Sequence, residues 1–108
     1  MNPADYDVAF KIISFAGNAK SAAMMAIRES REGNPEEARR LLTEADESLH
    51  AAHGAQTKLL TAEARGNAVP LNIILVHAQD HLTGAMLVRD LADEFTKLHD
   101  LVAARAAS

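Results

Sequence analysis

Apolar residues recur every three or four positions along most of this chain, the spacing that places them on one face of an α-helix. Glycines at positions 33 and 66 divide the pattern into three segments. The spacing predicts an all-α fold of three helices, over residues 3–32, 35–64 and 70–104. The predicted buried stripes are Val8, Ile12, Phe15, Ala19, Ala22 and Ala26 in the first helix and Ala38, Leu41, Leu42, Ala45, Leu49, Ala52, Leu59 and Leu60 in the second.

Glycine and proline mark both breaks between the helices. Gly33 can adopt the left-handed conformation that ends a helix, and Pro35 suits the first turn of the next one. Asn34 can cap that helix, and Glu37, three positions later, completes the pattern of a capping box. Residues 65–70 repeat the order of a glycine stop and a proline start.

The third helical segment carries apolar residues on more than one face. One face can pack against the first two helices, which leaves the other for a partner subunit. Short connections make successive helices antiparallel, so residues 1–108 are predicted to form one domain, an up-down-up three-helix bundle. The two apolar stripes are Leu71, Ile74, Leu75, Ala78, Leu82 and Ala85, and Ile73, Val76 and Leu87.

Composition and charge exclude several classes of function. The net charge is −4 and there is no run of lysine or arginine, which argues against binding to nucleic acid or to an anionic membrane surface. Cysteine is absent, which excludes disulfides and thiolate chemistry. The amino terminus does not have the pattern of a signal peptide, and the apolar runs are too short to cross a bilayer. We therefore expect a cytoplasmic protein without membrane insertion.

The stretch LVHAQDHL, residues 75–82, concentrates the candidate chemistry. His77, Asp80, His81 and Gly84 are spaced i, i+3, i+4 and i+7, so they share one helix face. A neutral imidazole on such a face can accept a phosphoryl group, because its pKa lies near neutrality and its second nitrogen can be held by a hydrogen bond. The spacing therefore allows histidine phosphorylation.

Three other interpretations of the histidines remain open on spacing alone. Two imidazoles four apart occur in helical zinc hydrolases, with an acidic residue as general base. Glu47 and His50 form one Glu-x-x-His element of the kind found in carboxylate-bridged di-metal bundles. The third interpretation gives the histidines no chemical role, and spacing alone favours it, most of all for His50, His53 and His99.

Asp80 interrupts an apolar line formed by Ile73, Val76 and Leu87. If that line is buried, an unpaired carboxylate there is too costly to persist. The carboxylate must then be protonated, hydrogen-bonded or bound to a cation. In a symmetric oligomer, copies of Asp80 could meet on the axis and share protons or a metal ion.

Three stretches together give the chain a resemblance to a known family. They are Gly17-Asn18-Ala19-Lys20-Ser21, His53 with Gln56-Thr57, and the whole of residues 75–82. In these stretches, and over about residues 8–100, the chain resembles the lactose/cellobiose-type enzyme IIA of the bacterial phosphoenolpyruvate-dependent sugar phosphotransferase system.

The resemblance implies a phosphotransferase component that works as a homotrimer. The residue matching His77 would accept phosphate from the histidine phosphocarrier protein HPr and pass it to a cysteine of the cognate enzyme IIB, for uptake of a disaccharide of the lactose, cellobiose or chitobiose type. Asp80 matches the family's metal-binding aspartate, which implies a divalent ion such as Mg²⁺ on the trimer axis. Gln79 and His81 match neighbouring motif positions and are given supporting roles.

Two features near His77 modify these expectations. Thr83-Gly84 stands where the family usually has Met and then Thr, and a helical glycine costs about 1 kcal/mol relative to alanine. Gly84 therefore predicts close backbone packing or extra mobility near His77. No basic residue lies within a turn of His77, so we expect phosphate charge to be compensated by hydrogen-bond donors, a neighbouring subunit or the partner protein. The rival hypothesis is a non-catalytic helical module for oligomeric interaction or regulation.

Overall fold

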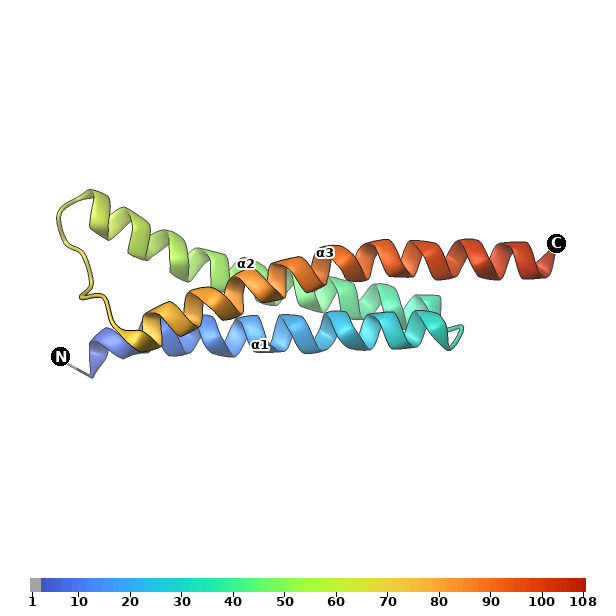
Figure 1. The fold of residues 1–108 in the computed structure, drawn as a ribbon, viewed down its shortest axis with the longest axis horizontal. Coiled ribbons are helices and arrows are strands. Elements are labelled where there is room, and N and C mark those ends of the chain that lie inside the picture. Colours follow the sequence, from blue (N-terminus) through green and yellow to red (C-terminus); the bar gives the residue numbers. More distant parts are fainter. Residues whose placement is uncertain (1–2) are drawn as a thin grey trace.

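A computed structural model describes residues 3–108 and contains three α-helices, α1 (Ala4–Arg31), α2 (Pro35–Ala64) and α3 (Ile73–Ala107). Successive helices run antiparallel, and α3 returns alongside α1 and continues past the turn between α1 and α2 (Figure 1). The predicted all-α, up-down-up three-helix bundle is confirmed. The first two residues of the predicted domain lie outside the described part of the chain.

Helix α1 is the element that holds the bundle together. It packs along both α2 and α3, whereas those two helices touch each other far less. The carboxyl-terminal part of α2 diverges from the other helices, and the connection to α3 spans the gap (Figure 1). The buried positions of α1 are mostly alanine, and small side chains let neighbouring helices approach closely. These buried residues of α1 are Ala9, Ile12, Ala16, Ala19, Ala22, Ala23, Ala26 and Ser30.

The core confirms most of the predicted stripes. Its largest fully buried side chains are Ile12, Leu41 and Leu82, one from each helix. Two predicted core positions are wrong. Leu60 of α2 is 59% exposed, whereas its neighbour Leu59 is partly buried against the core, and Leu71 is 82% exposed because it precedes the first turn of α3.

Polar contacts across the helices fix how they are rotated against each other. Asn18 Nδ2 of α1 donates to Ser48 Oγ of α2 at 2.6 Å. Arg89 of α3 donates through two nitrogens to both carboxylate oxygens of Asp46 on α2, at 2.5 and 3.0 Å. This hydrogen bonding raises the pKa of Arg89 above its usual value. A bidentate pair restricts orientation as well as distance, so it sets the register of α2 against α3.

The turn between α1 and α2 confirms the glycine stop and corrects the predicted cap. Gly33 has φ 85°, in the left-handed region, and Pro35 opens α2. However, the Asn34 side chain makes no capping bond, because its Nδ2 donates to Glu29 Oε2 at 2.8 Å. Glu37 is likewise engaged, with the guanidinium of Arg40. The capping box is therefore absent, since both of its side chains bind other partners.

Both ends of α3 differ from the prediction. The helix begins at Ile73 and not at residue 70, because Asn72 Oδ1 accepts a hydrogen bond from the Leu75 backbone N–H at 2.9 Å and so caps the first turn. At the other end the helix continues to Ala107, beyond the predicted end at residue 104. No helix within residues 3–108 is both long and apolar enough to cross a bilayer.

Candidate functional site

A surface hollow of about 280 Å³ lies against α3. Three of its five lining residues belong to the stretch LVHAQDHL, and a fourth, Gly84, follows that stretch on the same helix. His77, Asp80, His81 and Gly84 line it together, as their spacing predicts. The fifth lining residue is Lys20 of α1. The hollow therefore combines two imidazoles, a carboxylate and an ammonium group.

The two imidazoles contact each other directly. His77 Nε2 and His81 Nε2 are 3.0 Å apart, and the ring centroids are 4.4 Å apart with the ring planes at 89°. At that distance the two nitrogens share one hydrogen, so one ring donates and the other accepts. His77 is exposed, while His81 is partly buried. His77 is thus the imidazole that a second protein can reach.

Lys20 is the site residue that sequence reasoning missed. It stands 57 positions before His77, but its helix brings it to the same hollow. Ala16 and Ala19 of α1 are buried in one cluster with Ala85 of α3, and these small side chains bring the two helices together beside the hollow. The sequence next to His77 holds no basic residue, and α1 adds one to the lining of the hollow. The only signal in the sequence was the presence of Lys20 within the GNAKS stretch.

Gln79 lies on a different side of α3 from the hollow. Its Oε1 accepts a hydrogen bond from Gln56 Nε2 of α2 at 2.5 Å, and its side chain is absent from the lining around His77. Residues two apart are separated by about 200° around a helix, so Gln79 and His77 point in nearly opposite directions. In the single chain Gln79 therefore joins α3 to α2, and its supporting role at the phosphoryl group stays a prediction.

Asp80 is exposed, and it borders both the hollow around His77 and an apolar line of α3. Val76 and Leu87, on either side of it along the same line, are 45% and 60% exposed in the single chain. No group of three or more His, Cys, Asp or Glu side chains that could hold a metal ion occurs within the described residues. A single chain therefore offers Asp80 as an isolated carboxylate, and neither the hydrolase nor the di-metal interpretation finds a full ligand set there.

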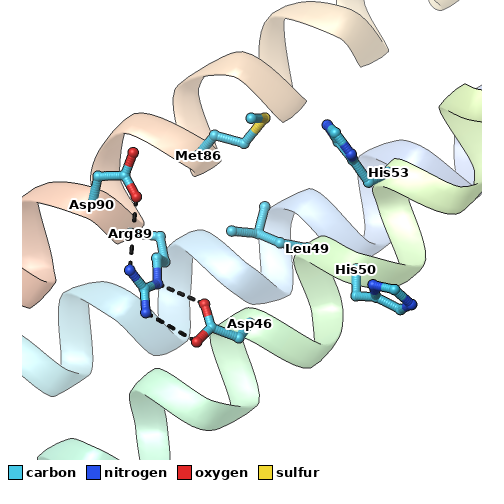
Figure 2. Close-up of a pocket in the computed structure, with 7 residues that line it drawn as sticks. All are labelled: Asp46, Leu49, His50, His53, Met86, Arg89 and Asp90. Carbon is cyan, nitrogen blue, oxygen red and sulfur yellow. Dashed lines mark hydrogen bonds and ion pairs between the residues drawn. The ribbon is translucent and has the colours of Figure 1, made fainter.

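A second hollow, of about 330 Å³, lies between α2 and α3 (Figure 2). It is lined by Asp46, Leu49, His50, His53, Met86, Arg89 and Asp90. Its cation is already engaged, because Arg89 is hydrogen-bonded to Asp46 and lies 3.7 Å from Asp90 (Figure 2). This hollow has no free positive charge for an anion, so the hollow around His77 is the better candidate site.

Of the two explanations expected for Gly84, close backbone packing finds no support within this chain. A Cβ added at this position would meet no atom within 4 Å. We therefore predict that Gly84→Ala raises the free energy of unfolding by about 1 kcal/mol, through helix propensity alone. Urea unfolding at one fixed protein concentration measures the change. Gly33→Ala should lower stability instead, because φ at Gly33 is 85°; a destabilising effect at both glycines would contradict the assignment of open space at Gly84.

The family model described as "PTS system, Lactose/Cellobiose specific IIA subunit" matches residues 7–100 of this chain. The chain belongs to this family. The match covers the three-helix core and the whole hollow around His77. Enzyme IIA components of the phosphotransferase system (PTS) are phosphotransferase components that carry phosphate between proteins.

Individual relatives agree with this membership. The chain is 42% identical over 102 residues to the lichenan-specific phosphotransferase enzyme IIA component of Bacillus subtilis, covering 94% of this chain and 93% of that protein. The crystal structure of the PTS cellobiose-specific enzyme IIA from Bacillus anthracis matches with a TM-score of 0.93 and 38% identity, over 96% of this chain and 95% of that one. Enzyme IIA in the IIA(chitobiose)–HPr complex of Escherichia coli matches with a TM-score of 0.79 and 31% identity, over 92% and 96%.

Proposed function

We propose that this enzyme IIA accepts a phosphoryl group on His77 from phosphorylated HPr and donates it to a cysteine of its cognate enzyme IIB in the cytoplasm. The sugar taken up would be a disaccharide of the lactose, cellobiose or chitobiose type. The observation that carries the proposal is the exposed imidazole of His77 in a hollow that also holds a second imidazole and a lysine. HPr is supported as the donor by the solved complex of a relative with that protein.

Both transfers exchange one bond to phosphorus for another. In the first, the lone pair of a neutral His77 nitrogen attacks phosphorus, and the phosphorus–nitrogen bond of the donor phosphohistidine breaks as the donor imidazole keeps the electron pair. In the second, a cysteine thiolate of enzyme IIB attacks, a phosphorus–sulfur bond forms, and His77 leaves as a neutral imidazole. Nothing is oxidised or reduced, so positioning and charge stabilisation are the main demands on the protein.

His81 fits the role of a helper for His77. If His81 Nε2 carries the shared hydrogen, it donates to the lone pair of His77 Nε2 at 3.0 Å and holds that ring in place. When phosphate arrives at His77 Nε2, the same N–H can turn to a phosphoryl oxygen. Charge-rich oxygens accept stronger hydrogen bonds than a neutral ring nitrogen does, which favours the phosphorylated state.

A homotrimer is proposed from the uncovered face of α3. Six large apolar residues of this helix lie close to one line and are all exposed in the single chain, a pattern that favours burial against other subunits. Asp80 lies within this line, so three symmetric copies would bring three carboxylates toward the axis, and carboxylate oxygens suit a cation such as Mg²⁺. When bound, the cation would neutralise the charge of the three carboxylates. The six residues are Ile73, Val76, Leu87, Leu91, Leu98 and Val102.

The axial role of Asp80 predicts separate effects on assembly and on metal binding. Asp80→Leu should preserve or strengthen the trimer, because it removes repulsion between buried carboxylates, and should abolish binding of the axial cation. Sedimentation and calorimetric titration with Mg²⁺ measure the two effects. Asp100→Leu is the matched control, since this exposed aspartate lies on the opposite side of α3 and should leave metal binding unchanged. Dissociation of the Asp80→Leu variant to monomers would contradict the proposed role.

Incubation with phosphoenolpyruvate, enzyme I and HPr tests the carrier function itself. The carrier should gain one acid-labile phosphate per chain, and addition of the cognate enzyme IIB should remove it. A non-catalytic interaction module with the same fold would stay unmodified under these conditions. Absence of label in the wild-type protein would overturn the proposal.

A further inference from the structure

Lys20 is placed where it can bind the phosphoryl group itself. We propose that its ammonium group forms a charge-assisted contact with the phosphoryl oxygens carried by His77, an inference that rests on the proposed carrier function. Both side chains line the same hollow of about 280 Å³, one from α1 and the other from α3. Helix α1 would then contribute a side chain that binds the phosphoryl group, in addition to packing against α3.

The charges in the hollow favour such a group. A phosphoryl group on His77 brings nearly two negative charges next to the carboxylate of Asp80, which lines the same hollow. Lys20 is the one cationic side chain among the five lining residues. Without Lys20, the lining would supply no lysine or arginine to face the arriving phosphate, so the transfer would be less favourable.

Lys20 is also free to take this role. Within the described residues, the ion pairs of α1, α2 and α3 engage Arg31, Arg39, Arg40, Arg89 and Lys97, and none includes Lys20. The lysine is exposed on a long, flexible stem, so its ammonium can follow the phosphoryl group as it arrives and leaves. By contrast, Arg89 is held by two carboxylates and cannot move to an anion without breaking those bonds.

The backbone beneath Lys20 is rigidly placed. Ala19 is fully buried against α3, and Asn18 is hydrogen-bonded to Ser48 of α2. These two neighbours fix the rotation of α1, so residue 20 is directed to the hollow while residue 18 is directed to α2. The position of the lysine is therefore set by packing, and only its terminal group needs to move.

The experiment compares Lys20→Met with wild type using two phosphoryl donors. One donor is phosphorylated HPr; the other is phosphoramidate, a small molecule that transfers its phosphoryl group to imidazole and releases ammonia. Because phosphoramidate makes no protein interface, it separates binding of the phosphoryl group from docking of HPr. We expect Lys20→Met to be phosphorylated about ten- to a hundredfold more slowly by both donors, the loss typical of one hydrogen bond to a charged group.

Two further variants serve as controls. Lys11→Met removes another exposed lysine of α1, one that lines a different hollow, and should be phosphorylated at the wild-type rate with both donors. Lys20→Arg keeps the charge and should restore most of the rate. Circular dichroism melts should be the same for all of these variants, since both lysines are exposed.

The outcomes separate this inference from the proposed function. A labelled wild type with an equally fast Lys20→Met variant would overturn the role of Lys20 and leave the carrier function standing. Slowing with HPr alone would also overturn it, because it would assign Lys20 to docking. An unlabelled wild type would overturn both. Slowing with both donors, with Lys11→Met unaffected, is the result that supports the inference.

Discussion

His77→Ala is expected to abolish phosphorylation of this enzyme IIA by phosphoenolpyruvate, enzyme I and HPr. The methyl group of alanine offers no lone pair to phosphorus, and the neighbouring His81 cannot substitute, because it is partly buried while His77 is exposed. The bundle should be unaffected, since His77 contributes nothing to the buried core. Radiolabelled phosphoenolpyruvate, with the acid-lability of the label as a second criterion, measures the loss.

His53→Ala is the matched control for this variant. His53 is also an exposed helical histidine, and it lines the second hollow between α2 and α3 (Figure 2). Its removal should leave the amount of label per chain unchanged. If His77→Ala keeps its label and His53→Ala loses it, the acceptor belongs to the second hollow and the site has been assigned to the wrong face.

Leu82→Ala should produce the largest loss of stability among single core changes near the site. Leu82 is 1% exposed and packs in a cluster with Ile12, Ala52 and Ala78, so truncation leaves a cavity that small neighbours cannot fill. Leucine-to-alanine changes at such positions cost about 2–5 kcal/mol. Urea unfolding followed by circular dichroism measures the change, at one protein concentration because the stability of the proposed trimer would depend on it.

Leu60→Ala gives the comparison for this core change. Leu60 is 59% exposed on α2 and lies away from the exposed line of α3, so its truncation should cost well under 1 kcal/mol. Equal costs at positions 60 and 82 would mean that the core is not centred on Leu82. The same result would restore Leu60 to the buried stripe that its spacing predicts.

The helices could be predicted because their signals are local. Helical spacing located the buried Leu41 and Leu82, and the glycine at position 33 marked the turn that the structure confirms. The start of α3 was harder, since both Pro70 and Asn72 can open a helix and only the bond from Leu75 N–H to Asn72 decides between them. Competition between partners also removed the predicted cap, because Asn34 binds Glu29 instead.

The residues that α3 contributes to the candidate site could be predicted from the sequence, whereas the residue from α1 could not. His77, Asp80 and His81 are close in sequence, so helical periodicity alone placed them on one face. Lys20 is far from His77 in sequence. Its position at the hollow depends on how α1 is rotated against α3, which periodicity does not specify. Periodicity also could not show that the side chain of Gln79, two positions from His77, is hydrogen-bonded to Gln56 of α2.

The central position of α1 also limits how its sequence can vary. Its buried alanines face two neighbouring helices, and α2 and α3 make little contact with each other that could absorb a shift. A larger residue at Ala19 would displace α1 from α3 beside the hollow, and would move Lys20 with it. Substitutions on the exposed surfaces of α2 and α3 outside the proposed subunit interface and the hollow carry no such penalty. We therefore expect helix α1 to tolerate few larger residues at its buried positions, although the proposed phosphate acceptor lies on another helix.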